Sequence, residues 1–204
     1  MRLNPMFETS LAVAAWPSRS SAALRFVALA VIGSALLTLS AKTQVPFWPV
    51  PMTMTSFTVL MIGATYGSRL ALATVLLYLA QGFAGLPVFA GPVAGPAYLI
   101  GPTAGFLWGY VASAYLVGLA ADRGWSRSTL RIATAMLAGE IVLFAMGFAW
   151  LAWFATLSSG AVGLGAGKAL AAGVTPFILG DLVKIAIAAL AVPAGWRVLE
   201  RLRR

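Results

Sequence analysis

The chain contains no cysteine and no histidine, and only five of its 204 residues are acidic. Without cysteine there is no disulfide, no thiolate metal site and no cysteine nucleophile. Without histidine the chain lacks the commonest metal ligand and the commonest general base. An enzyme built on this sequence would have to work with two acids in apolar surroundings, Glu140 and Asp181. We therefore expect no metal, no other cofactor and no enzyme.

Charge of both signs is scarce, at 9% of the residues, whereas soluble domains carry about 25%. Hydrophobic residues make up 61% of the chain. These proportions predict an integral membrane protein that lies in lipid. The net charge of +9 comes from basic residues scattered over the loops rather than gathered in one stripe. That distribution argues against a partner of nucleic acid.

Six apolar runs are predicted to cross the membrane as helices. The first has about 20 residues, which at about 1.5 Å each span a hydrocarbon core of ~30 Å, and the second is shorter. The predicted fold is thus all-α, with spans at 22–41, 53–66, 70–85, 103–121, 132–157 and from 176 onward. Residues 1–21 are interpreted as a cytoplasmic tail, and residues 22–204 as one transmembrane substrate-binding domain. No signal peptide is expected, because the apolar stretch 11–16 is shorter than a signal core.

The basic residues predict the orientation, since cytoplasmic loops carry an excess of Lys and Arg. With both termini in the cytoplasm, every arginine falls inside, Lys42 and Lys168 fall outside, and Lys184 lies within the membrane. Three unusual loops, 42–52, 86–102 and 158–175, then lie on the outer side. The second of these is rich in Gly and Pro and carries no charge, so we expect a re-entrant cap over an outward-facing pocket.

Asp181 and Lys184 stand three residues apart at the head of the last span, which places them on one helix face. A charge at the centre of a spanning helix costs about 2.5–3.5 kcal/mol on insertion scales, and intramembrane ionisable residues commonly mark functional sites. The alternative is an ion pair that only fixes helix packing. For Glu140, inside the fifth span, three roles stay open: a second pocket wall, a proton-relay acid, or a packing acid bonded to a hydroxyl.

A strip of small residues on the first span, Ala30 and Ser34, allows another helix to approach closely. That helix belongs either to the same chain or to a partner. A glycine-rich stretch at 163–169 departs from a phosphate-binding loop, because Val162 and Ala169 stand where Gly and Ser or Thr are needed. The chain therefore carries no ATP-binding loop of its own.

Four segments in one order and spacing resemble a known family. They read QVPFWPVPMT at 44–53, GLPVFA at 85–90, GPTAGF at 101–106 and PFILGDLVK at 176–184. Together they are similar to the BioY family, the biotin-specific S components of energy-coupling factor (ECF) transporters. The similarity runs from about residue 22 to residue 200.

The resemblance implies a six-helix, multi-pass S component of the cell membrane that captures biotin from outside with very high affinity. It also implies a transmembrane coupling subunit and ABC-type ATPases as partners, with Ala30 and Ser34 as the docking strip. Asp181 is expected to accept from the ureido N–H groups of biotin, and Lys184 to bind its ureido carbonyl or its carboxylate. The substrate-binding residues expected are Trp48, Thr53, Leu86, Val88, Phe89, Tyr98, Gly101, Thr103, Gly105, Glu140, Asp181 and Lys184.

Two other classes of protein remain open at this point. One is an S component or a solo carrier for another small vitamin or anion. The other is a membrane enzyme that uses Glu140 and Asp181 as acid and base. The missing histidine and cysteine disfavour the enzyme.

Overall fold

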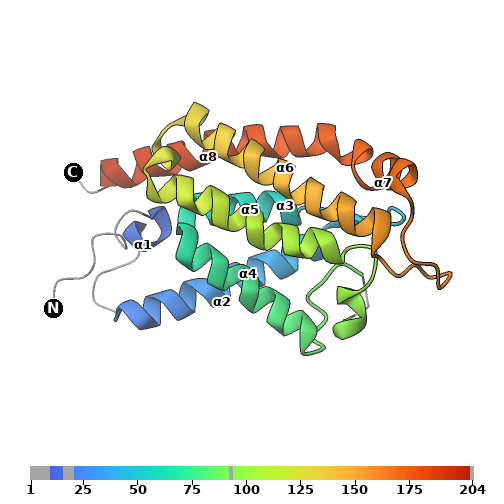
Figure 1. Cartoon of the computed structure of the whole chain (residues 1–204). Helices are drawn as coiled ribbons and strands as arrows, with labels where there is room; N and C mark the ends of the chain where they lie inside the picture. The colour runs from blue at the N-terminus through green and yellow to red at the C-terminus, as the bar shows by residue number, and fades with distance from the viewer. Residues whose placement is uncertain (1–9, 16–20, 92–93, 203–204) are drawn as a thin grey trace.

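The fold is a bundle of long helices, seen in a computed structural model that describes residues 10–15, 21–91 and 94–202 (Figure 1). The long helices are α2 (Ala22–Lys42), α3 (Thr55–Tyr66), α4 (Ser68–Phe83), α5 (Ala104–Asp122), α6 (Thr129–Trp153) and α8 (Ile178–Leu202). The shorter elements are α1 (Leu11–Ala15), α7 (Ala166–Gly173), the 3-10 turns η2 (Pro96–Leu99), η3 (Trp125–Arg127) and η4 (Thr175–Phe177), and the strands β1 (Gln44–Val45) and β2 (Met52–Thr53). The expected all-α fold thus holds, apart from one short strand pair.

Four segments are long and apolar enough to cross a membrane, which supports an integral membrane protein. They are α2, α5, α6 and the continuous stretch Ala166–Leu202 that ends in α8. The helices α3, with 12 residues, and α4, with 16, are apolar but shorter. Each of the six predicted spans corresponds to a helix, while the number of crossings stays a prediction.

The central helix is α5, which contacts α3, α4 and α6. Glycines allow the close approach of α5 and α6. A Cβ added to Gly109 on α5 would lie 3.0 Å from the Leu143 backbone, and one added to Gly139 on α6 would lie 2.7 Å from the Ser113 hydroxyl. Membrane helices associate through such close packing rather than through a hydrophobic drive, so the two helices hold a fixed relative position.

The two ends of the bundle differ in what they carry (Figure 1). α1 and the C-terminal end of α8 lie at one end, whereas η2 and α7 lie at the other. The junction between α5 and α6, which holds Arg123 and Arg127, lies at the end with α1. The loops that were expected to share one side therefore gather at the end opposite to α1.

Part of the stretch expected to be an N-terminal tail, residues 1–21, is helical. Residues 11–15 form α1, which packs against α3 and α8. Leu11 joins the core cluster that contains Trp196, and Ser10 is buried. An apolar stretch too short to be a signal peptide still serves to cover the bundle. Residues 1–9 and 16–20 of the predicted tail lie outside the described residues.

The three unusual loops have different structures. The proline-rich segment 42–52 is largely extended, as expected, with Gln44 paired to Thr53 and Val45 to Met52 across β1 and β2. The segment 86–102 contains η2 and buries Val88 and Phe89. The interpretation of 158–175 as a plain loop is wrong, because α7 forms within it. The alanines that made the segment look like a small-residue linker are the strongest helix formers.

In this structure Ala30 and Ser34 face another helix of the same chain, and their docking role stays a prediction. They are 6% and 0% exposed, respectively. The Ser34 hydroxyl donates a hydrogen bond to the side-chain oxygen of Gln81 on α4. A Cβ added to Gly33 would lie 2.6 Å from the Thr74 methyl group, also on α4. The small residues serve the contact between α2 and α4 of the chain itself.

Candidate ligand-binding site

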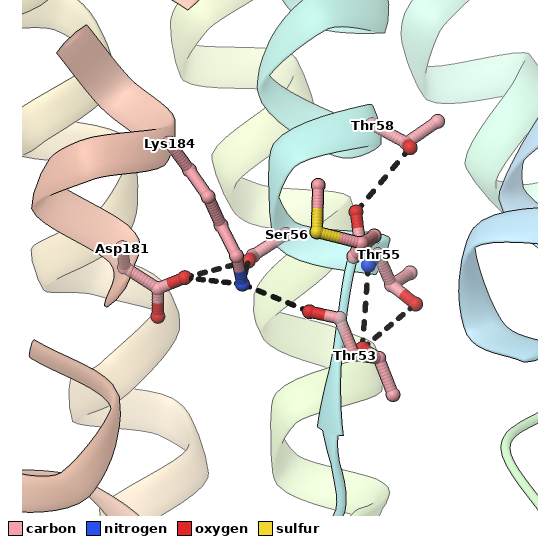
Figure 2. Close-up of polar contacts among 7 residues, drawn as sticks. Thr53, Thr55, Ser56, Thr58, Asp181 and Lys184 are labelled. Carbon is pink, nitrogen blue, oxygen red and sulfur yellow. Dashed lines mark hydrogen bonds and ion pairs between the residues drawn. The ribbon is translucent and has the colours of Figure 1, made fainter. Parts of the chain in front are cut away.

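Lys184 is the centre of a compact polar cluster between α8 and the start of α3 (Figure 2). Its Nζ donates to the backbone oxygen of Thr53 at 2.8 Å, to Ser56 Oγ at 3.1 Å and to Asp181 Oδ1 at 2.7 Å. The Ser56 hydroxyl in turn donates to Asp181 Oδ1 at 2.9 Å. An ammonium group has three donors, so those of Lys184 are fully used before any ligand binds.

Local structure explains how these groups meet. Asp181 lies in the first turn of α8, where the helix dipole favours a negative charge. Lys184 follows one turn later on the same face. Thr53 ends the return strand of the hairpin and Ser56 lies in the first turn of α3, so the hairpin delivers both groups to α8. Side-chain exposure is 7% for Asp181 and 18% for Lys184, and the pair is therefore largely removed from water.

This cluster forms one side of a pocket of about 570 Å³, a volume that includes its open mouth. Pockets for small organic molecules have apolar walls with a few converging polar groups. Here the lining comes from α2, α3, α4, α5, α6, η4, α8, the hairpin and the segment 86–102. The lining residues are Ala41, Val50, Pro51, Thr53, Thr55, Ser56, Tyr78, Ala90, Tyr98, Thr103, Phe106, Leu107, Tyr110, Glu140, Leu143, Phe144, Phe177, Asp181 and Lys184.

The structure brings only some of the predicted substrate-binding residues to this pocket. Those in the lining are Thr53, Tyr98, Thr103, Glu140, Asp181 and Lys184. Trp48 and Leu86 are 67% and 52% exposed and are not among the lining residues. The side-chain directions of irregular loops follow no period, so the sequence could not show whether these two residues line the pocket.

Four further predicted residues stand behind the lining instead of in it. Val88 and Phe89 are buried, and the Phe89 ring stacks on Tyr98 with centroids 4.7 Å apart. The Gly101 carbonyl accepts a hydrogen bond of 2.9 Å from the indole of Trp150. Gly105 allows α5 to pass Trp150, since an added Cβ would run into that side chain. These residues shape the walls rather than contact the cavity.

Several lining residues were missed by the sequence reasoning, and one of them had a usable signal. Phe144 follows Glu140 by four residues, the spacing of a shared helix face. Other missed residues, such as Tyr110 on α5 and Phe177 in η4, reach the pocket only through the packing of these elements against the other helices.

Glu140 lines the pocket from α6 and is 5% exposed. Within the described part of the chain, neither carboxylate oxygen of Glu140 has a hydrogen-bond partner. Its electrostatic neighbours are Asp181 and Lys184 on α8. The pocket therefore presents two acids and one base, and the base is already fully bonded.

Known proteins resemble this chain along most of its length. A relative named probable biotin transporter BioY, from Pyrococcus horikoshii, is 34% identical over 162 residues, which cover 79% of this chain and 90% of the relative. The biotin transporter BioY of Thermotoga maritima is 31% identical over 167 residues, which cover 82% of this chain and 93% of that relative.

The fold has a counterpart among solved structures, the S-component for biotin from an ECF-type ABC transporter. The two chains superpose with a TM-score of 0.69 and 21% identity, over 89% of this chain and 92% of the other. This likeness supports the fold. Residues 12–201 match the BioY family, which includes α1 and exceeds the similarity expected from the motifs. The chain therefore belongs to the BioY family.

Proposed function

We propose that the chain captures biotin and acts as the substrate-binding S component of an ECF-type transporter in the cytoplasmic membrane. The observation that carries this proposal is the cluster of Asp181, Lys184 and Ser56 at one side of a largely apolar pocket. The family membership and the names of the relatives point to the same ligand.

The chemistry of biotin suits this pocket. Its ureido ring has two N–H donors and one carbonyl acceptor, its thiolane ring is apolar, and its tail ends in a carboxylate. Both bonds from Ser56 and Lys184 end on Oδ1 of Asp181, and the second carboxylate oxygen points away from them (Figure 2). That oxygen is available to a ureido N–H, and a charge-assisted bond in a water-poor site is stronger than a neutral one. Phe106, Leu143 and Phe144 offer apolar surface to the rest of the molecule.

Lys184 needs a different role from the one the sequence suggested. Since Thr53, Ser56 and Asp181 occupy its donors, a bond from Lys184 to the ligand would have to replace one of these three. We propose that Lys184 chiefly orients Asp181, and that any direct bond to the ureido carbonyl is formed by exchange with Ser56, the longest of the three contacts.

Energy for transport would come from partner subunits. The sequence contains no phosphate-binding loop, so we propose that a transmembrane coupling subunit and ABC-type ATPases drive uptake. The termini and the arginine-rich α5–α6 junction would face the cytoplasm, and the pocket would open outward beside the hairpin and the segment 86–102. Purified chain should accordingly hydrolyse no ATP.

A titration of the purified, detergent-solubilised chain tests the proposal. Calorimetry with biotin should show saturable binding of one ligand per chain. Thiamine, riboflavin and lipoate, added at the same concentrations, should give no heat of binding and should not displace biotin. If biotin fails to bind, or a rival vitamin binds more tightly, the proposed function is wrong.

A further inference from the structure

Glu140 differs from the other acidic residues that the structure describes. Asp181 accepts from Ser56 and Lys184, Asp122 accepts from the amide and hydroxyl of Ser68, and Glu200 pairs with Arg127. Glu140 is as buried as Asp181, at 5% exposed, yet both of its oxygens lack a donor among the described residues. Buried polar groups in folded proteins are nearly always bonded, so an exception calls for an explanation.

The position of Glu140 is imposed by helix packing. Its neighbour Gly139 faces α5, where an added Cβ would lie 2.7 Å from Ser113 Oγ. Leu143 and Phe144, one turn later on α6, line the same pocket. Glu140 therefore lies on the pocket face of a helix that cannot rotate away from α5, and its carboxylate is held at the cavity.

The two acids of the pocket stand on different helices, α8 for Asp181 and α6 for Glu140. A hydrogen bond between them would require one carboxyl group to hold a proton, because two ionised carboxylates are acceptors only. Lys184 has no donor left for Glu140, because its ammonium group donates to Thr53, Ser56 and Asp181. Among the described residues no donor reaches Glu140, and a ligand with N–H groups would supply one.

We propose that Glu140 contacts the ligand and accepts a hydrogen bond from one ureido N–H, while Asp181 accepts from the other. The two N–H bonds of a five-membered cyclic urea point away from each other on either side of the carbonyl, so one carboxylate cannot accept from both. Asp181 on α8 and Glu140 on α6 supply the two separate carboxylates that this arrangement needs. The proposal rests on the proposed function, because it names the part of biotin that the pocket holds. It also places the carboxylate tail of biotin away from Glu140, since like charges repel.

The test compares variants and ligands in one set of titrations. The variants are Glu140→Met, which removes the acceptor, and Glu140→Gln, which keeps the shape and removes the charge. Ser113→Ala is the matched control, because Ser113 is buried beside Gly139 and is absent from the pocket lining. The ligands are biotin, desthiobiotin and two N-methylbiotins. Desthiobiotin keeps both N–H groups without the thiolane ring, and each N-methylbiotin carries a methyl group on a different one of the two ureido nitrogens. Size-exclusion profiles and thermal unfolding show which variants fold.

A lost bond to a charged group corresponds to a drop in affinity of about 10- to 100-fold. Glu140→Met should show this drop for biotin and, by the same factor, for desthiobiotin. For one of the two methylated isomers the substitution should have no effect, because the N–H that meets Glu140 is already blocked. Glu140→Gln should weaken biotin about 5- to 10-fold, since a neutral acceptor forms the weaker bond, and Ser113→Ala should change nothing.

Other results would overturn the proposal. If Glu140→Met weakens all four ligands equally, the residue acts on the fold and not on a ureido N–H. If Glu140→Gln binds biotin as tightly as the wild type, Glu140 holds a proton, for example one shared with Asp181, and does not accept from the ligand. The second result decides the question even if Glu140→Met fails to fold. Wild-type protein that binds no biotin at all would instead disprove the proposed function.

Discussion

Lys184 and Asp181 form an ion pair of 2.7 Å within one helix, and the same ammonium group reaches the backbone oxygen of Thr53, 131 positions earlier in the chain. The pair thus joins the start of α8 to the hairpin and α3 while it keeps Asp181 facing the pocket. A contact that links two distant segments and also prepares a ligand-binding carboxylate has both a structural and a functional part. The two parts can be separated by substitution.

Replacing Lys184 with Met should impair both parts. Breaking a buried ion pair by removing one partner costs about 3–5 kcal/mol, because the other charge is left uncompensated. We expect a lower unfolding temperature and greatly weakened biotin binding. The double substitution Lys184→Met with Asp181→Leu should recover much of the thermal stability, since it leaves no unpaired charge, but it should not restore binding. Recovery of binding in the double variant would show that the pair serves only the fold.

Lys42 connects the end of α2 to the segment 86–102, with its Nζ 2.8 Å from the carbonyl oxygens of both Phe89 and Gly91. That segment contributes Ala90 and Tyr98 to the pocket. We expect Lys42→Met to loosen the segment 86–102 and to raise the biotin dissociation rate about 3- to 10-fold, since changes in affinity act mainly on dissociation. Stopped-flow displacement of a labelled biotin measures this rate.

The control for this experiment is Lys168→Met, which removes another exposed lysine. Its dissociation rate should equal that of the wild type. Equal rates for Lys42→Met and the wild type would mean that the two hydrogen bonds from Lys42 do not hold the segment 86–102 in place.

The local part of the site was predictable, and the part that depends on helix packing was not. Residue spacing alone places Asp181 and Lys184 on one face of a helix, and the structure pairs them. No spacing rule connects Glu140 on α6 with α8, so its three possible roles could not be ranked from the sequence. The Pro and Gly residues of 86–102 predicted an irregular segment over the pocket. They did not indicate that Phe89 turns inward behind Tyr98 while Leu86 points outward.

The helices themselves followed from apolar runs, and the errors came from small residues. Alanine and glycine occur in linkers, in helices and at helix contacts, so composition did not distinguish α7 from a loop. The same ambiguity left open whether Ala30 and Ser34 contact a partner or another helix of the chain, and in this structure they pack against α4. Small residues record that something approaches closely, and not which helix it is.

Substitution of Ser34 by Trp should therefore destabilise the isolated chain. Ser34 is fully buried and bonded to Gln81, so the larger side chain must separate α2 from α4. Overpacking of this kind costs about 1–3 kcal/mol or more. Thermal unfolding and the yield of monodisperse protein measure the effect. Val31→Trp is the control, because Val31 lies on the same helix and is 50% exposed. If Ser34→Trp is as stable as Val31→Trp, then α2 does not pack against α4 through this face.

The most direct test of the account is the biotin affinity of Asp181→Asn compared with that of the wild type, measured by calorimetry in the same detergent. Asparagine keeps the shape of the side chain but removes the charge that pairs with Lys184 and accepts from the ligand. The account predicts a folded, monodisperse variant whose dissociation constant is at least about 100-fold higher, since losing one partner of a buried pair costs several kcal/mol. Equal affinities of the two proteins for biotin would contradict it.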